Sequence, residues 1–132
     1  MPRIAYVNGR YVRHAVAAVH IEDRGYQFAD GVYEVCEVKS GYIVDMPRHL
    51  GRLDRSLSEL SIDWPVHRNV LPVILREVVR RNGVVDGLVY FQVTRGVAAR
   101  DFPFPDGVRP ALVVTARKVP AGMQDKRAET GI

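Results

Sequence analysis

Residues Asp23–Val35 read DRGYQFADGVYEV and place charged, amide and aromatic side chains directly before an apolar strand. The stretch is too polar for a core and too aromatic for a linker. Gly25 and Gly31 allow positive φ or close backbone approach, so the segment can turn sharply and end beside a ligand. Tyr33 then opens an alternating pattern that runs to Val38. The pattern predicts a binding site mounted on a strand or, as the plainer alternative, a turn-rich hairpin with incidental tyrosines.

Two dipeptides predict hairpins on either side of this segment. Asn8-Gly9 suits a type I′ turn because that turn needs positive φ at both central positions. Ser40-Gly41 is expected to form a second hairpin turn between two β-rich runs. The predicted strands are residues 4–7, 11–13, 32–39, 42–44, 88–94 and 111–116.

Two helices are predicted between the second hairpin and the last strands. The first starts at Pro47, which suits the first helical turn, and runs to about residue 60. The second covers about residues 67–82 and ends at Asn82-Gly83, a C-cap signature. Because the strands come as hairpins and not as βαβ units, we expect a two-layer α+β domain of mainly antiparallel sheet with two packed helices. The expected buried faces contain Leu50, Leu53, Leu57 and Leu60 in the first helix, and Val70, Ile74 and Val78 in the second.

Composition predicts one domain without a membrane span. At 132 residues and 47% hydrophobic, the chain can bury one ordinary core, which we place at residues 1–120. Residues 121–132 are polar and aperiodic and are expected to start an interdomain linker. Apolar runs are short and no apolar signal region is present, so we expect a cytoplasmic protein. The single cysteine, Cys36, excludes an internal disulfide or a multi-cysteine metal site and predicts a small packed side chain.

The net charge of +4 suggests a nucleic-acid partner as an alternative. The arginines are scattered from Arg3 to Arg127 beside acidic residues, without a block of like charge, which favours solvated surface over a nucleic-acid site. A non-catalytic basic binding module therefore remains the alternative of another class. Heparin retention that collapses with salt would favour it.

Together with HLGRL at residues 49–53 and YFQVTRG at residues 90–96, DRGYQFADGVYEV closely resembles the fold-type-IV pyridoxal-phosphate family. That family includes D-amino-acid transaminases, branched-chain aminotransferases and aminodeoxychorismate lyase. The tripeptides YQF and YEV within the first motif are more similar to the D-amino-acid transaminases. The resemblance implies the N-terminal domain of a homodimeric, pyridoxal 5'-phosphate-dependent enzyme. Such an enzyme moves an amino group from a D-amino acid, such as D-alanine, to a 2-oxo acid. An L-branched-chain aminotransferase or an aminodeoxychorismate lyase is the alternative within the fold.

The resemblance also implies a second domain that carries the Schiff-base lysine. Lys39, Lys118 and Lys126 lie in a hairpin, near a strand end and in the polar tail, which predicts solvent-exposed ammonium groups. A Schiff-base lysine must lose its proton, which requires desolvation or a nearby cation. None of the three matches the family's lysine segment. We therefore expect no catalytic residue in this chain and the lysine-bearing domain outside it.

Three arginines of the first predicted helix, Arg48, Arg52 and Arg55, fall opposite its leucines. On the residues alone this pattern predicts a solvated face, with Arg55 paired to Glu59. By resemblance, Arg52 matches the HL-x-RL arginine that holds the cofactor phosphate, a task that suits the guanidinium fork. His49 is expected to be a packing residue.

By resemblance, Tyr33 and Arg100 bind the substrate carboxylate. A phenol suits this role because it donates a hydrogen bond without adding negative charge. Without the resemblance, Tyr33 is equally well interpreted as an ordinary aromatic residue at the start of a strand. Arg100 lies in the loop RGVAARDFPFPDG, where an ordinary loop arginine is the simpler interpretation. Better-known D-amino-acid transaminases carry Arg-x-His here, and this chain has Phe102 in place of the histidine. The substitution leaves the mode of carboxylate binding open.

Overall fold

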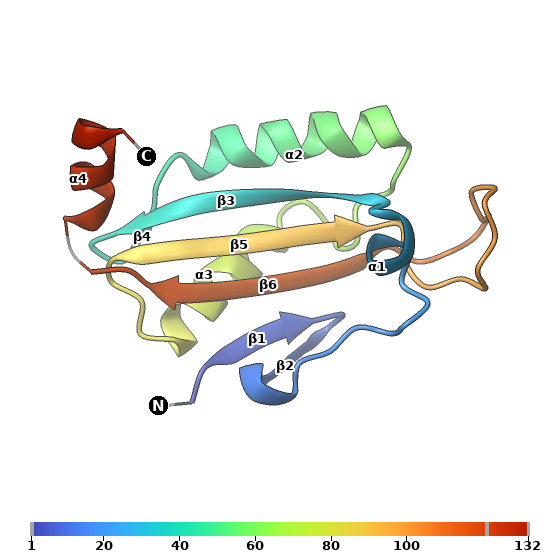
Figure 1. The fold of residues 1–132 in the computed structure, drawn as a ribbon, viewed down its shortest axis with the longest axis horizontal. Helices are drawn as coiled ribbons and strands as arrows, with labels where there is room; N and C mark the ends of the chain where they lie inside the picture. The colour runs from blue at the N-terminus through green and yellow to red at the C-terminus, as the bar shows by residue number, and fades with distance from the viewer. Residues whose placement is uncertain (1, 121, 132) are drawn as a thin grey trace.

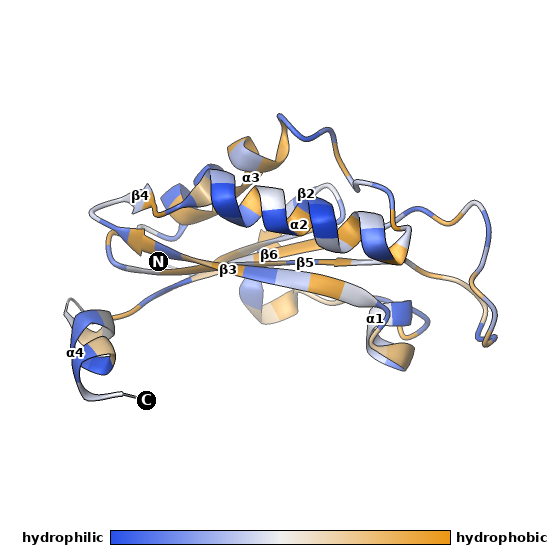
Figure 2. Ribbon diagram, turned by 90° about the horizontal axis from the view of Figure 1, so that it is seen from above, coloured by the Kyte–Doolittle hydropathy of each residue, from blue (hydrophilic) through white to orange (hydrophobic). Residues whose placement is uncertain are grey.

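The computed structural model describes residues 2–120 and 122–131, which form a six-stranded antiparallel sheet with two long helices on one face (Figure 1). The strand order is β2-β1-β6-β5-β3-β4. Figure 2 shows α2 and α3 on one side of the sheet and α1 and α4 on the other. The predicted two-layer α+β architecture is confirmed. The elements are β1 (Ile4–Val7), β2 (Arg10–Arg13), η1 (His14–Val16), α1 (Arg24–Phe28), β3 (Gly31–Lys39), β4 (Tyr42–Ile43), α2 (Met46–Leu60), α3 (Leu71–Arg81), β5 (Gly87–Thr94), β6 (Ala111–Lys118) and α4 (Met123–Thr130).

Both predicted hairpins form, and each turn has positive φ at its two central residues. Asn8 and Gly9 have φ of 46° and 95° between β1 and β2. Ser40 and Gly41 have φ of 51° and 81° between β3 and β4. The twist of such turns matches that of the flanking strands, which explains why these dipeptides end one strand and start the next.

The centre of the sheet consists of three long strands, β3, β5 and β6, paired antiparallel in the order β3-β5-β6. Alternate side chains point towards α2 and α3, and on β5 these are Val89, Phe91 and Val93, all fully buried. The opposite face carries Tyr33 and Tyr90, and neither long helix covers it.

The two long helices follow the prediction with two corrections. Leu53 and Leu57 of α2 are buried, but Leu60 is 42% exposed because the helix ends there and Ile62 enters the core instead. The second helix starts at Leu71 and not at residue 67, because Pro72 lacks the N–H that would continue the hydrogen bonds backwards. Val70 is therefore an exposed cap residue and not part of the buried face.

The end of α3 is the predicted cap. Gly83 has φ of 59°, and its N–H donates to the Arg80 carbonyl. The Val84 N–H reaches back to the Val79 carbonyl, which completes a Schellman motif. Val84 is buried, so the same motif turns the chain from α3 towards β5.

The segment before β3 forms the short helix α1, which the sequence pattern did not predict. Asp23 caps it by accepting a hydrogen bond from the Gly25 N–H at 2.8 Å. Gly25 and Gly31 serve close approach and not positive φ: a Cβ on Gly31 would lie 2.6 Å from the Val93 carbonyl oxygen. Ala29, with φ of 54°, makes the sharp turn instead.

Residues 123–130 of the expected linker form α4, while residues 121 and 132 of that expectation lie outside the described residues. The helix was not predicted because the segment has no apolar period, and its described side chains are largely exposed. Within residues 2–120 and 122–131, no helix combines the length and apolar character that a bilayer crossing requires.

Candidate functional site

Arg52 lies on the surface of α2 and is held by a carboxylate of the neighbouring strand. Its Nε and Nη2 each donate to Glu34 on β3, with both distances at 2.8 Å. The Arg52 side chain remains 66% exposed, whereas that of Glu34 is 6% exposed. The predicted solvated face is present at Arg52, but the ion pair that ties this arginine to a buried carboxylate was not predicted. The predicted face also includes Arg55, which pairs with Glu59 at 3.2 Å as expected.

Glu34 is the buried centre of this group. Its Oε1 also lies 2.7 Å from Nδ1 of His49, so His49 packs with its ring hydrogen-bonded to a buried carboxylate. Burial raises the pKa of the Glu34 carboxyl, but hydrogen bonds from Arg52 and His49 outweigh burial and hold the pKa below its usual value. Glu34 is therefore a carboxylate at neutral pH.

The sequence pattern of β3 contains a signal for a buried, paired Glu34. Glu34 is in phase with Cys36 and Val38, which face the core of the same strand. An acidic residue at an inward position is rarely buried unless it is paired. The inward position of Glu34 in the alternating pattern therefore indicates that its carboxylate has a cationic partner, but the pattern does not identify that partner as Arg52.

The guanidinium of Arg52 keeps one edge available. Arginine has five N–H donors, and Glu34 takes one from Nε and one from Nη2. Among the described residues, Nη1 makes no hydrogen bond. A guanidinium fixed on one edge and open on another is suited to bind a phosphate or carboxylate oxygen.

Tyr33 lies on the other face of β3, where the residue is 64% exposed. It stacks on Tyr90 of β5, with ring centroids 5.5 Å apart and planes at 27°. Burial, and secondarily Tyr33, raises the pKa of the Tyr90 hydroxyl, which donates to Gln92. Tyr33 and Glu34 are consecutive on β3, so their side chains point to opposite faces of the sheet. Arg52 therefore contacts one face of the strand, and the stacked Tyr33 and Tyr90 lie on the other.

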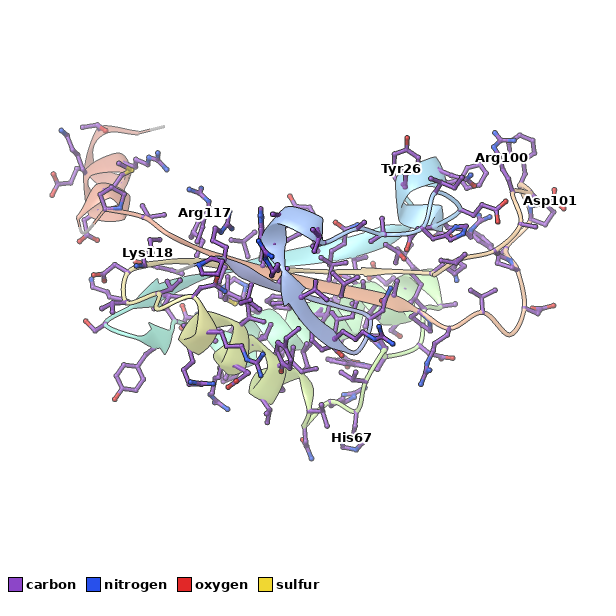
Figure 3. All side chains as sticks on the ribbon, turned by 90° about the horizontal axis from the view of Figure 1, so that it is seen from below. Tyr26, His67, Arg100, Asp101, Arg117 and Lys118 are labelled. Atoms are coloured by element: carbon purple, nitrogen blue, oxygen red, sulfur yellow. The ribbon has the colours of Figure 1, made fainter. Side chains whose placement is uncertain are left out.

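Arg100 lies in the loop between β5 and β6, where aromatic rings hold its guanidinium. Its guanidinium carbon is 5.2 Å from the ring centroid of Phe28 and 5.2 Å from that of Phe102. Figure 3 shows Arg100 and Asp101 at the end of the molecule near Tyr26, opposite Arg117 and Lys118. Within the part of the chain that the structure describes, no hydrogen bond, ion pair or cation–π contact joins Arg100 to Tyr33 or Arg52.

A second buried carboxylate anchors the base of this loop. Asp30 accepts from Arg24 Nε at 2.8 Å and from Arg95 Nε at 2.7 Å. Arg24 also donates to the Asp101 carbonyl at 2.8 Å. Burial raises the pKa of Asp30, but Arg95 and Arg24 hold it below its usual value. This anchor was not predicted from the sequence because Arg95 is 65 residues from Asp30 along the chain.

The lysines and the cysteine of this chain lie in surroundings that do not activate them as nucleophiles. Lys39, Lys118 and Lys126 are exposed, as predicted. Cys36 is fully buried, as predicted, and burial raises the pKa of its thiol to about 12. Among residues 2–120 and 122–131, no group of three or more His, Cys, Asp or Glu side chains is arranged to hold a metal ion.

The six-stranded sheet with α2 and α3 on one face is the architecture of the N-terminal domain of fold-type-IV aminotransferases. The branched-chain amino acid aminotransferase of T.th. with pyridoxamine 5'-phosphate matches with a TM-score of 0.84 at 19% identity, over 96% of this chain and 43% of that chain. The 4-amino-4-deoxychorismate lyase of Pseudomonas aeruginosa matches with a TM-score of 0.75 at 24% identity, over 97% and 44%. Residues 31–132 match the model of the amino-transferase class IV family, and the chain belongs to that family.

Curated relatives place the chain within the family. It is 40% identical over 125 residues to the D-alanine aminotransferase of Bacillus licheniformis, covering 95% of this chain and 44% of the relative. It is 35% identical over 113 residues to the D-alanine aminotransferase of Staphylococcus haemolyticus, covering 85% and 40%. The chain therefore spans less than half the length of these relatives.

Proposed function

We propose that this chain is the N-terminal part of a pyridoxal 5'-phosphate-dependent aminotransferase. The proposed reaction moves an amino group from a D-amino acid, such as D-alanine, to a 2-oxo acid. The observation that carries the proposal is the free edge of Arg52, fixed by Glu34, in a chain 40% identical to a D-alanine aminotransferase. Residues 1–120 are the domain in this proposal, residues 121–132 begin the linker, and the lysine-bearing domain belongs to the rest of the protein.

The residues present fit the phosphate of the proposed cofactor. Arg52 offers its unbonded Nη1 to phosphate oxygens, and its charge is permanent at any physiological pH. Glu34 holds the other edge of the guanidinium, and His49 holds Glu34. When bound, pyridoxal phosphate supplies an electron sink for the bonds to the substrate α-carbon.

Tyr33 and Arg100 are the proposed ligands of the substrate carboxylate. The exposed Tyr33 hydroxyl can donate one hydrogen bond, and stacking on Tyr90 limits the movement of its ring. Arg100 offers a charged donor, and Phe28 and Phe102 fix its position in the loop. In this proposal Phe102 acts through Arg100 and does not bind the carboxylate itself.

A cytoplasmic homodimer is the proposed form of the complete enzyme. Three aromatic side chains around α1 and the Arg100 loop are more than two-thirds exposed, namely Tyr26, Phe102 and Phe104. Exposed aromatic groups of this kind are enriched in interfaces between subunits. A buried, unpaired Cys36 fits a reducing compartment.

Substrate stereochemistry separates this proposal from the alternatives of the same fold. An L-branched-chain aminotransferase or an aminodeoxychorismate lyase shares the architecture, but the curated relatives at 35–40% identity are D-alanine aminotransferases. The test is steady-state transamination by the complete gene product with D-alanine and with L-valine. We expect turnover of D-alanine, whereas exclusive turnover of L-valine would establish an L-branched-chain aminotransferase.

A further inference from the structure

We propose that Glu34 is a positioning residue: it orients the Arg52 guanidinium so that the Nη1 edge meets the cofactor phosphate. The inference rests on the proposed function, because it takes the phosphate as the ligand of Arg52. It adds a role for a carboxylate that would not itself touch the cofactor.

The two partners differ sharply in burial. Glu34 lies on β3, is paired with Phe91 of β5 and points inwards, so the sheet fixes its position. Arg52 is mostly solvent-exposed on α2, and an exposed arginine normally samples many rotamers. Two parallel hydrogen bonds of 2.8 Å define both the place and the plane of its guanidinium.

His49 supports the same geometry from the other side. Its Nδ1 donates to Glu34 Oε1 at 2.7 Å, and the same oxygen accepts from Arg52 Nη2. Glu34 Oε2 accepts from Arg52 Nε. Because contacts on both oxygens constrain the carboxylate, its rotation is restricted and it transmits a defined orientation to Arg52.

The charges indicate that this arrangement serves position rather than attraction. Glu34 offsets the charge of Arg52, so a site that needed only positive charge would bind an anion better without the carboxylate. The repulsion between Glu34 and a phosphate is weakened because Arg52 lies between them and water reaches the site. Preorientation of Arg52 lowers the conformational entropy that is lost when the phosphate binds. This gain is not electrostatic, so water and salt do not screen it.

The test compares two ligands that differ only in the phosphate. Apparent dissociation constants for pyridoxal 5'-phosphate and for pyridoxal are measured by fluorescence titration of the full-length protein and its variants. We expect Glu34→Gln to lower the preference for the phosphorylated ligand about five- to tenfold, with pyridoxal binding unchanged. Glu34→Gln with Arg52→Ala should be no worse than Arg52→Ala alone, because Glu34 acts through Arg52.

Glu37→Gln is the matched control, since Glu37 lies on the same strand but on the opposite face. It should leave the preference unchanged. If Glu34→Gln does not fold, Glu34→Asp keeps the charge but shortens its reach, and it should lower the same ratio. Thermal melting establishes folding for each variant.

The outcomes separate this inference from the proposed function. A loss of preference in Arg52→Ala without a loss in Glu34→Gln would overturn the positioning role and leave the phosphate site intact. An unchanged preference in Arg52→Ala would overturn both. An equal loss of pyridoxal and pyridoxal phosphate binding in Glu34→Gln would show that the carboxylate only stabilises the fold and would also overturn the positioning role.

Discussion

Glu34 and Arg52 form a two-point ion pair between β3 and α2, with a buried carboxylate on one side and a solvent-exposed guanidinium on the other. The pair joins residues 18 positions apart and fixes the guanidinium that we propose as the phosphate ligand. We expect this ion pair to affect both the stability of the domain and the retention of the proposed cofactor.

The first prediction concerns the pH dependence of stability. The folded-state pKa of Glu34 is lowered, so its contribution is complete above the unfolded-state pKa and is lost as the pH falls through the folded value. Glu34→Gln should lower the free energy of unfolding at pH 7 by about 1–3 kcal/mol. The difference from the unmodified chain should shrink below about pH 4. Urea unfolding at pH 7 and pH 3 measures both values, and a difference as large at pH 3 as at pH 7 would contradict the linkage.

The second prediction distinguishes Arg52 from its helix neighbours. In the complete enzyme, Arg52→Ala should weaken retention of pyridoxal phosphate about tenfold or more, because a charge-assisted phosphate contact is lost. Arg48→Ala and Arg55→Ala should have little effect, since Arg55 pairs with the exposed Glu59 and Arg48 is exposed. Cofactor content after dialysis is the measurement. Similar losses in all three variants would place Arg52 among the solvated residues.

The third prediction concerns the lysines of this chain. Lys39, Lys118 and Lys126 are all exposed to solvent, and none lies in the enclosed surroundings that a Schiff-base lysine needs. Residues 1–132 incubated with pyridoxal phosphate and reduced with borohydride should therefore carry no stoichiometric lysine adduct. Peptide mass spectrometry gives the result. One fully modified lysine would show that this chain supplies the lysine that we assign to the rest of the protein.

The fourth prediction concerns Arg100 and its aromatic neighbours. In the complete enzyme, Arg100→Ala should raise the KM for amino acids strongly, because a buried substrate carboxylate loses a partner at a cost of about 2–5 kcal/mol. Cofactor binding should change little. Phe102→Ala should raise the same KM by a smaller factor, since a cation–π contact at an exposed site contributes about 0.5–1 kcal/mol.

Two further Phe102 variants test how the ring acts. Phe102→Tyr keeps a ring beside Arg100 and should behave like the unmodified enzyme. Phe102→His adds a donor to the loop and should tighten carboxylate binding. Normal kinetics in Arg100→Ala would remove this loop from the substrate site.

The fifth prediction tests close approach at the start of β3. A Cβ on Gly31 would lie 2.6 Å from a backbone oxygen of Val93, so Gly31→Ala should destabilise the domain by about 1–3 kcal/mol. Gly51 in α2 has no atom within 4 Å of an added Cβ. Gly51→Ala should therefore stabilise the helix by about 0.5–1 kcal/mol. Thermal unfolding of both variants provides the comparison, and changes of the same sign would contradict the packing argument.

The local features were predictable because short dipeptides determine them. Asn8-Gly9 and Ser40-Gly41 tolerate positive φ and so place two hairpin turns, and Asn82-Gly83 ends α3 in the predicted cap. The boundary errors also have local causes: Pro72 delays the start of α3. The segment before β3 was predicted to carry a binding site, but its helix was not predicted because five residues are too few for a periodic pattern.

The sequence by itself determined the hairpins, the two long helices, the α+β class and, through its resemblance to a family, the candidate arginines and tyrosine. Only the tertiary structure decided that Glu34 holds Arg52, that Asp30 joins Arg24 to Arg95, and that Phe102 packs against Arg100. Turn and cap preferences depend on neighbouring backbone angles, so they can be read from adjacent residues. The pairing of charges depends on which distant segments the core brings together, and burial then makes that pairing obligatory.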